Sequence, residues 1–224
     1  TIIQKSKNPK IKFLILDKTF LNKKKIQELK INKFFYTIKK KSDFKKSFHS
    51  GFGIETDIHA TKDQQFICFH DFTFNRMFEK NLSIKNLNYA NIKKISSLKK
   101  SPIPLLDDVL IVSKNKYPLL IELKPTFSNK LLKKLVRISS KYSKCIFISF
   151  KHINIYRLLR IKSNLNVGLS FAYNSSVKTI IQKSKNPKIK FLILDKTFLN
   201  KKKIQELKIN KFFYTIKKKS DFKK

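Results

Sequence analysis

The chain has 224 residues, 41% of them hydrophobic, and carries 52 Lys and Arg against 14 Asp and Glu. This length and apolar share fit one domain with its own core, and single α/β barrels reach this size. No stretch approaches 18 consecutive apolar residues, so the sequence excludes a membrane-spanning helix. No signal peptide is visible, and we expect a cytoplasmic protein.

The net charge of +38 has two explanations. It is typical of proteins that bind nucleic acid or anionic membranes. It is also what an A/T-rich gene encodes, since Lys, Ile, Asn and Phe are abundant while Gly, Met and Trp are scarce. The second explanation is favoured because the lysines are spread along every segment. In either case the surface would attract anionic substrates.

Short apolar runs of β-forming residues alternate along the chain with Lys-rich segments of helical periodicity. The runs predicted as strands are 11–16, 34–38, 52–58, 66–70, 118–123, 145–150, 166–171, 189–194 and 212–216. Helices are predicted between them, for example over 131–142 and 153–161. Strands that alternate with helices predict a parallel sheet covered on both faces. The pattern favours an α/β fold of the (β/α)8 TIM-barrel type over an open sheet.

Residues 1–46 recur letter for letter as residues 179–224. Repeat architectures show several drifted copies of a short unit, so two perfect copies do not indicate a solenoid. The pattern indicates a recent duplication, or a 178-residue unit read past its own end. A third explanation is an artefact of gene rearrangement or sequence assembly, in which case this chain has no selected function.

Chemistry-bearing residues stand near the ends of three predicted strands. Glu55 and Asp57 are two apart, so both face the barrel interior, and Glu122 and Lys124 share a face in the same way. His70 ends the run 66–70. In a TIM barrel these strand ends meet at one mouth. Buried carboxylates need a cation, so we expect Mg²⁺ or Ca²⁺ there, with purely structural ion pairs as the alternative.

Around these residues the sequence resembles the glycerophosphodiester phosphodiesterase family. That family reads E-x-D, then T-K-D-G, then a strand ending in H-D followed by L-x-R. The matching residues here are Glu55 and Asp57, Thr61 to Asp63, His70 and Asp71, and Arg76, with Gln64 in place of the usual Gly. Segments 87–95, 103–110 and 121–124 are similar to its L-T-x-x-E-L, I-P-x-L-x-E-x-L and I-E-x-K motifs. Ser149, Phe150 and 212–216 are similar to its fifth and eighth strands, with Tyr214 where a Trp is common.

The resemblance implies a role for each matching site residue. Glu55, Asp57 and Glu122 match the metal ligands, His70 matches one of two catalytic histidines, and Lys124 matches a lysine that contacts the phosphate. The implied activity is metal-dependent hydrolysis of a small-molecule glycerophosphodiester to glycerol 3-phosphate and an alcohol. We expect no specific nucleic-acid partner. The alternative is a non-catalytic basic protein that binds nucleic acid or anionic membranes.

One departure from the family concerns its first strand, which carries H-R-G and supplies the other catalytic His and an Arg. This sequence contains no H-R-G, and 33–38, a copy of the eighth strand, stands where that strand is expected. We therefore predict a barrel over residues 33–224 whose first strand is replaced by this copy. Residues 1–32 would be a surplus strand and helix, loosely packed. Activity is expected to be impaired.

The remaining histidines and the cysteines are expected to have ordinary roles. We expect His49 to be exposed on a helix and His152 to lie on the surface. His59 is expected to be solvated beyond its strand, with a place at the barrel mouth as the alternative. Asp195 is expected to cap a turn. Cys68 and Cys145 lack ligand spacing, which predicts buried, reduced side chains.

Overall fold

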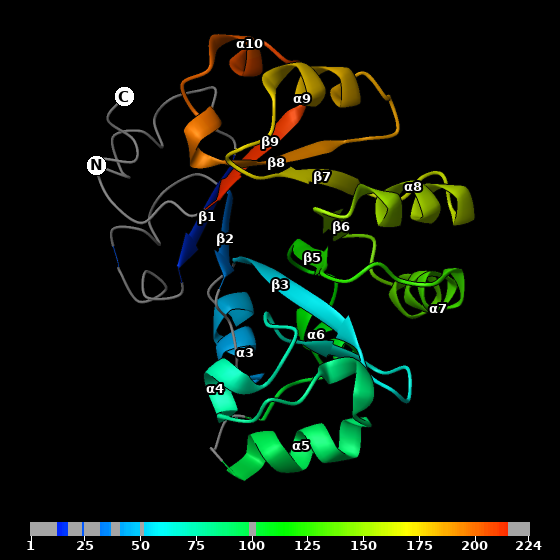
Figure 1. The fold of residues 1–224 in the computed structure, drawn as a ribbon. Helices are drawn as coiled ribbons and strands as arrows, with labels where there is room; N and C mark the ends of the chain where they lie inside the picture. The colour runs from blue at the N-terminus through cyan, green and yellow to red at the C-terminus, as the bar shows by residue number, and fades with distance from the viewer. Residues whose placement is uncertain are drawn as a thin grey trace.

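The computed structural model describes residues 13–17, 24, 32–36, 41–49, 52–98 and 102–214 (Figure 1). For residues 13–17 and 32–36 the backbone alone is described. Along most of the chain, strands and helices alternate as the sequence predicts. Within the described residues, no helix is long and apolar enough to cross a membrane.

Nine strands form one sheet within the described residues. They are β1 (Phe13–Asp17), β2 (Asn32–Tyr36), β3 (Gly53–Ala60), β4 (Phe66–Cys68), β5 (Leu119–Leu123), β6 (Cys145–Ser149), β7 (Val167–Phe171), β8 (Phe191–Asp195) and β9 (Asn210–Tyr214). Eight of them pair in the order β1-β2-β3-β5-β6-β7-β8-β9, and every pairing in this path is parallel. The α/β class and the parallel sheet are therefore as predicted.

The helices follow most strands, and most of them lie on the outside of the sheet (Figure 1). They are α3 (Lys41–His49), α4 (Asn75–Phe78), α5 (Tyr89–Leu98), α6 (Leu106–Ser113), α7 (Asn129–Ser139), α8 (His152–Ile161), α9 (Val177–Ser184) and α10 (Lys202–Gln205), with 3-10 turns η2 (Ile84–Asn86) and η3 (Lys196–Phe198). Of these, α4 and α5 lie beyond β4 and pack in an apolar cluster of their own. Serine caps start two of the helices. The hydroxyl of Ser128 accepts the Leu131 amide at α7, and that of Ser176 accepts the Thr179 amide at α9.

The strand over 66–70 was wrongly expected to be part of the alternating parallel pattern. It is the short strand β4, which pairs antiparallel with β3 and lies off the main path. The reason is the connection between them, which spans only residues 61–65. A parallel connection needs a crossover of a dozen or more residues, whereas a few residues suffice for a hairpin.

The turn between β3 and β4 shows why glycine is usual at one position of the family motif. Gln64, which stands where the family usually has Gly, has a φ of 60°. This left-handed conformation is one that glycine adopts without steric cost. Asp63 holds the turn by accepting hydrogen bonds from the Thr61 hydroxyl and the Tyr89 amide.

The two identical segments form the same structural unit twice. Phe13–Asp17 pairs with Asn32–Tyr36 in the register in which Phe191–Asp195 pairs with Asn210–Tyr214. The β1 and β9 strands end the path, and some of their Cα atoms come within 8 Å of each other. The pairings of the described strands include none between β1 and β9, and most of 1–32 lies outside the described residues. Barrel closure, replacement of the first strand and the division at residue 32 stay predictions.

The sheet separates two apolar layers. The larger layer packs the outer face of the strands against the helices and includes Ile54, Ile121, Phe147 and Leu158. The smaller layer lies on the opposite face and contains Leu120, Ile146, Ile148, Ile193 and Phe212. These inner residues alternate with outer ones along each strand, as a two-residue period requires. Cys68 and Cys145 are buried and free, as predicted.

Gly168 on β7 shows how tightly the inner layer is packed. A Cβ at this position would lie 2.6 Å from the Ile193 Cδ1 and 3.0 Å from the Phe191 carbonyl oxygen. The β7 and β8 backbones are hydrogen-bonded at this point, since Gly168 pairs with Phe191. The carbonyl therefore cannot yield without disturbing the ladder.

We expect Gly168→Ala to lower the free energy of unfolding by about 1–3 kcal/mol, the usual cost of overpacking. Urea denaturation would measure it. Ser170→Ala on the same strand is the matched control, because the buried Ser170 hydroxyl has no hydrogen-bond partner among the described residues and its removal should be neutral or stabilising. Equal stability of Gly168→Ala and the wild type would contradict the close packing.

Candidate metal and catalytic site

Three carboxylates lie on the inner face of two neighbouring strands. On β3, Ile54, Thr56 and Ile58 are buried, and Glu55 and Asp57 alternate with them, so their side chains leave the opposite face. Glu122 on β5 is the register partner of Asp57 and follows Leu120 of the inner layer by two residues. The alternation predicted from the sequence thus places all three carboxylates together.

The three side chains could hold a metal ion. One carboxylate oxygen from each of Glu55, Asp57 and Glu122 lies within 4.8 Å of those of the other two. The donor set consists of hard anionic oxygens, which suit a divalent cation such as Mg²⁺ or Ca²⁺ better than a soft metal. The residues present therefore fit the ion that the sequence predicts, and they leave its identity open.

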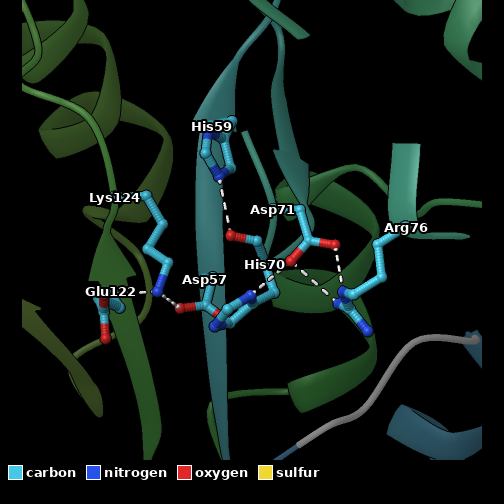
Figure 2. A network of polar contacts seen from close by, with 7 residues as sticks. All are labelled: Asp57, His59, His70, Asp71, Arg76, Glu122 and Lys124. Atoms are coloured by element: carbon cyan, nitrogen blue, oxygen red, sulfur yellow. Dashed lines mark hydrogen bonds and ion pairs between the residues drawn. The ribbon is translucent and has the colours of Figure 1, made fainter. Parts of the chain in front are cut away.

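Lys124 forms ion pairs with two of these carboxylates (Figure 2). Its Nζ lies 3.1 Å from Asp57 Oδ1 and 3.0 Å from Glu122 Oε1. The Lys124, Asp57 and Glu122 side chains are only 16%, 14% and 11% exposed. Burial opposes the charge of Lys124, but the two carboxylates outweigh it and raise the pKa of the ammonium.

Burial and mutual repulsion disfavour negative charge at the site. The pKa of Glu55 is raised well above its usual value by burial and by the charges of Asp57 and Glu122, and Lys124 opposes this only in part. Burial and Asp57 raise the pKa of Glu122 to about 7. The ammonium therefore does not fully compensate the cluster, and further positive charge, from a proton or a metal ion, is favoured there.

His70 belongs to a chain of polar contacts beside the carboxylates (Figure 2). Its Nδ1 lies 2.7 Å from Asp71 Oδ1, while Arg76 donates from Nε to Asp71 Oδ2 at 2.7 Å and from Nη2 to Oδ1 at 2.9 Å. Partial burial opposes the ionisation of Asp71, but hydrogen bonds from Arg76 and His70 lower its pKa. An ionised Asp71 is an acceptor only, so Nδ1 of His70 donates to it and Nε2 faces away from this contact.

The β3–β4 hairpin brings His70 to the carboxylates. The Phe69 amide donates to the Asp57 carbonyl at 2.9 Å, which fixes the end of β4 beside a candidate ligand. His70 is therefore positioned by a hairpin strand that lies outside the parallel path.

His59 is buried, so the expectation that it is solvated was wrong. It is 3% exposed, because β3 continues to Ala60 and β4 covers this extension. Its Nε2 lies 3.4 Å from the His70 carbonyl, and its ring meets Phe72 edge to face with centroids 4.9 Å apart. Burial lowers the pKa of His59 to about 4. The neutral ring therefore packs against the segment that carries His70 and helps to hold it in place.

The other polar residues singled out from the sequence lie in structural positions. His49 is exposed at the end of α3, as predicted. Asp195 accepts the Thr197 amide at 2.9 Å and caps η3, also as predicted. His152 is partly exposed at the start of α8, where its Nε2 lies 2.9 Å from the Ser170 carbonyl and its Nδ1 lies 2.6 Å from Lys183 Nζ.

Sequence reasoning gave no role to Asp71 and Arg76, although both lie in the quoted motifs. Their spacing of five residues crosses a bend and the start of α4, so no single period links them. The signal that could have identified them is chemical. An acidic residue directly after a candidate catalytic His, followed by an Arg, supplies the groups needed to orient an imidazole.

The acidic cluster on the inner face of this parallel α/β sheet, with a histidine and a lysine beside it, has the composition of a site that could bind a divalent ion. The model of the glycerophosphoryl diester phosphodiesterase family matches residues 43–221, and the chain belongs to this family. No curated protein sequence matches the chain significantly.

Solved structures of this family share the fold. A glycerophosphodiester phosphodiesterase from Thermotoga maritima superposes with a TM-score of 0.72 at 16% identity, covering 95% of this chain and 89% of that one. A phosphodiesterase from Oleispira antarctica, in complex with the product sn-glycerol-3-phosphate, gives a TM-score of 0.65 at 17% identity over 81% and 80% of the two chains. An enzyme from Parabacteroides distasonis gives 0.63 at 18% identity over 80% and 77%.

We expect Lys124→Met to lower the free energy of unfolding by about 3 kcal/mol in the presence of a chelator, because it leaves two buried carboxylates without their ammonium partner. Urea denaturation with and without Mg²⁺ or Ca²⁺ would measure this. The divalent ion should restore more stability to the variant than it adds to the wild type. Lys133→Met, an exposed change on α7, is the control. A variant as stable as the control would show that the ammonium is not needed.

We expect His152 to make stability depend on pH. Burial and the Lys183 ammonium lower its pKa below the usual 6.5, although the bond to the Ser170 carbonyl opposes this. Between the folded and unfolded pKa values the unfolded chain binds the extra proton, so the contribution to stability is present above pH 6.5 and is lost as pH falls. Urea denaturation from pH 8 to 5 would measure it against His152→Gln. A stability difference independent of pH would contradict a neutral His152.

Proposed function

We propose that the chain is a metal-dependent phosphodiesterase that hydrolyses glycerophosphodiesters to glycerol 3-phosphate and an alcohol. The observation that carries this proposal is the convergence of Glu55, Asp57 and Glu122 within 4.8 Å in a chain of this family. The Oleispira antarctica structure holds the product sn-glycerol-3-phosphate, which supports a substrate of this class.

The site residues have separate roles in this proposal. Glu55, Asp57 and Glu122 would hold a divalent ion, which supplies Lewis-acid polarisation of a phosphoryl oxygen when bound. Lys124, already beside two of these carboxylates, would also contact the substrate phosphate. His70 would exchange a proton with the substrate through Nε2, while Asp71 and Arg76 keep its ring oriented.

We further propose that turnover is impaired, because the sequence contains no H-R-G and one catalytic histidine is therefore missing. The positions of the other histidines support this. His49 ends an outer helix, His59 is buried against the His70 carbonyl, and both ring nitrogens of His152 are engaged. His59 and His152 are thus engaged in other contacts, and His49 lies on an outer helix, away from the face of the sheet that carries the carboxylates.

Hydrolysis of glycerophosphocholine with Mg²⁺ or Ca²⁺ tests the proposed activity. We expect chelator-sensitive release of glycerol 3-phosphate at a rate at least about 100-fold below that of a family member with H-R-G, the usual contribution of one acid–base group. Rapid turnover would refute the impairment. Absence of both turnover and metal binding would refute the enzyme assignment.

Glu55→Gln links the activity to the metal site, because it removes one charged ligand at nearly constant volume. We expect the thermal stabilisation by Mg²⁺ or Ca²⁺, and any turnover, to be lost in this variant. Glu206→Gln, which changes an exposed carboxylate outside the cluster, should retain both. The alternative of a non-catalytic polyanion-binding protein predicts salt-sensitive binding of polyanions that Glu55→Gln leaves unchanged.

A further inference from the structure

A groove with a strongly basic lining lies between α9 and α10, outside the sheet. Its volume is about 730 Å³, and none of the residues of the candidate catalytic site lines it. The two helices pack against each other beside β7 to β9 (Figure 1). This α9–α10 groove is lined by Val177, Lys178, Ile181, Gln182, Lys185, Lys201, Lys202 and Lys203.

The charge of the α9–α10 groove is entirely of one sign. Five of its eight lining residues are lysines, all five are exposed, and no carboxylate is among the eight. Lys178 lies on α9 and Lys185 caps its end. Lys201 precedes α10 as its cap, and Lys202 and Lys203 lie in its first turn, so the positive charge faces the groove from both sides. Such an arrangement concentrates anions in the groove.

The apolar part of the lining indicates which anion fits. Val177 and Ile181 lie four residues apart on α9 and therefore share one helix face, and both line the groove. None of the lining residues is aromatic, so the groove offers no platform on which nucleic-acid bases could stack. Lysine side chains cover apolar surface with their methylene stems while their ammonium groups reach the phosphate level of a lipid interface.

We propose that the α9–α10 groove is a docking surface for anionic phospholipid bilayers. Its lysines bind lipid headgroup phosphates, and Val177 with Ile181 contacts the apolar edge of the interface. Attraction of clustered lysines to anionic lipids is strong enough to localise a protein and falls with ionic strength. This inference does not depend on the proposed function, since binding is measured without substrate.

Vesicle co-sedimentation tests this inference. The wild type is mixed with phosphatidylcholine vesicles, with or without about 30% phosphatidylglycerol, over a range of NaCl concentrations. The groove variant replaces Lys178, Lys185, Lys201, Lys202 and Lys203 with Gln. The control variant replaces five exposed lysines elsewhere, Lys85, Lys93, Lys94, Lys130 and Lys133, and so has the same net charge. Circular dichroism verifies that both variants are folded.

We expect salt-sensitive binding only to the vesicles with phosphatidylglycerol. The groove variant should bind at least about tenfold more weakly than the wild type, and the control within about twofold, because the charge near the bilayer decides the affinity. Equal losses in the two variants would mean that diffuse charge alone causes binding and would overturn the proposal, as would no vesicle binding. Tighter binding of a single-stranded RNA, lost in the groove variant, would identify a nucleic-acid site and would also overturn it.

Discussion

The mutual repulsion of three carboxylates on adjacent strands is the constraint on which the candidate site depends. Glu55, Asp57 and Glu122 face the same side of the sheet because β3 and β5 are parallel and in register. Burial makes their charges costly, and Lys124 offsets only part of that cost. Three carboxylates with one ammonium group favour the binding of a further cation. Without that cation, their unbalanced charge destabilises the folded state.

The rest of the fold keeps these groups in place. Below the carboxylates, the inner layer of Leu120, Ile148 and Phe212 is closely packed, and Gly168 leaves the space that this packing needs. Beside them, the β3–β4 hairpin carries His70 to the edge of the cluster, where Asp71 and Arg76 orient it. Side chains from parallel strands thus supply the charged groups, whereas a local antiparallel arm supplies the acid–base group.

Much of this arrangement follows from the sequence, because strand periodicity is a local property. The alternation of Glu55 and Asp57 with apolar neighbours was enough to place both on one face. The direction of β4 could have been predicted from its short connection to β3, which allows only a hairpin. The burial of His59 depends on β4 covering the end of β3, and the role of Arg76 depends on a bend, so neither follows from a periodic pattern.

The duplicated segment lets this protein separate sequence preference from surroundings. The same five residues, NKFFY, form β2 and β9, and each pairs with an identical neighbour in the same register. On its other side, however, β2 pairs with β3, whereas β9 ends the described path. Any difference in backbone protection between these twin strands must come from their environment, since their covalent chemistry is the same. Comparing β2 with β9 therefore measures how much tertiary contacts contribute to the stability of a strand.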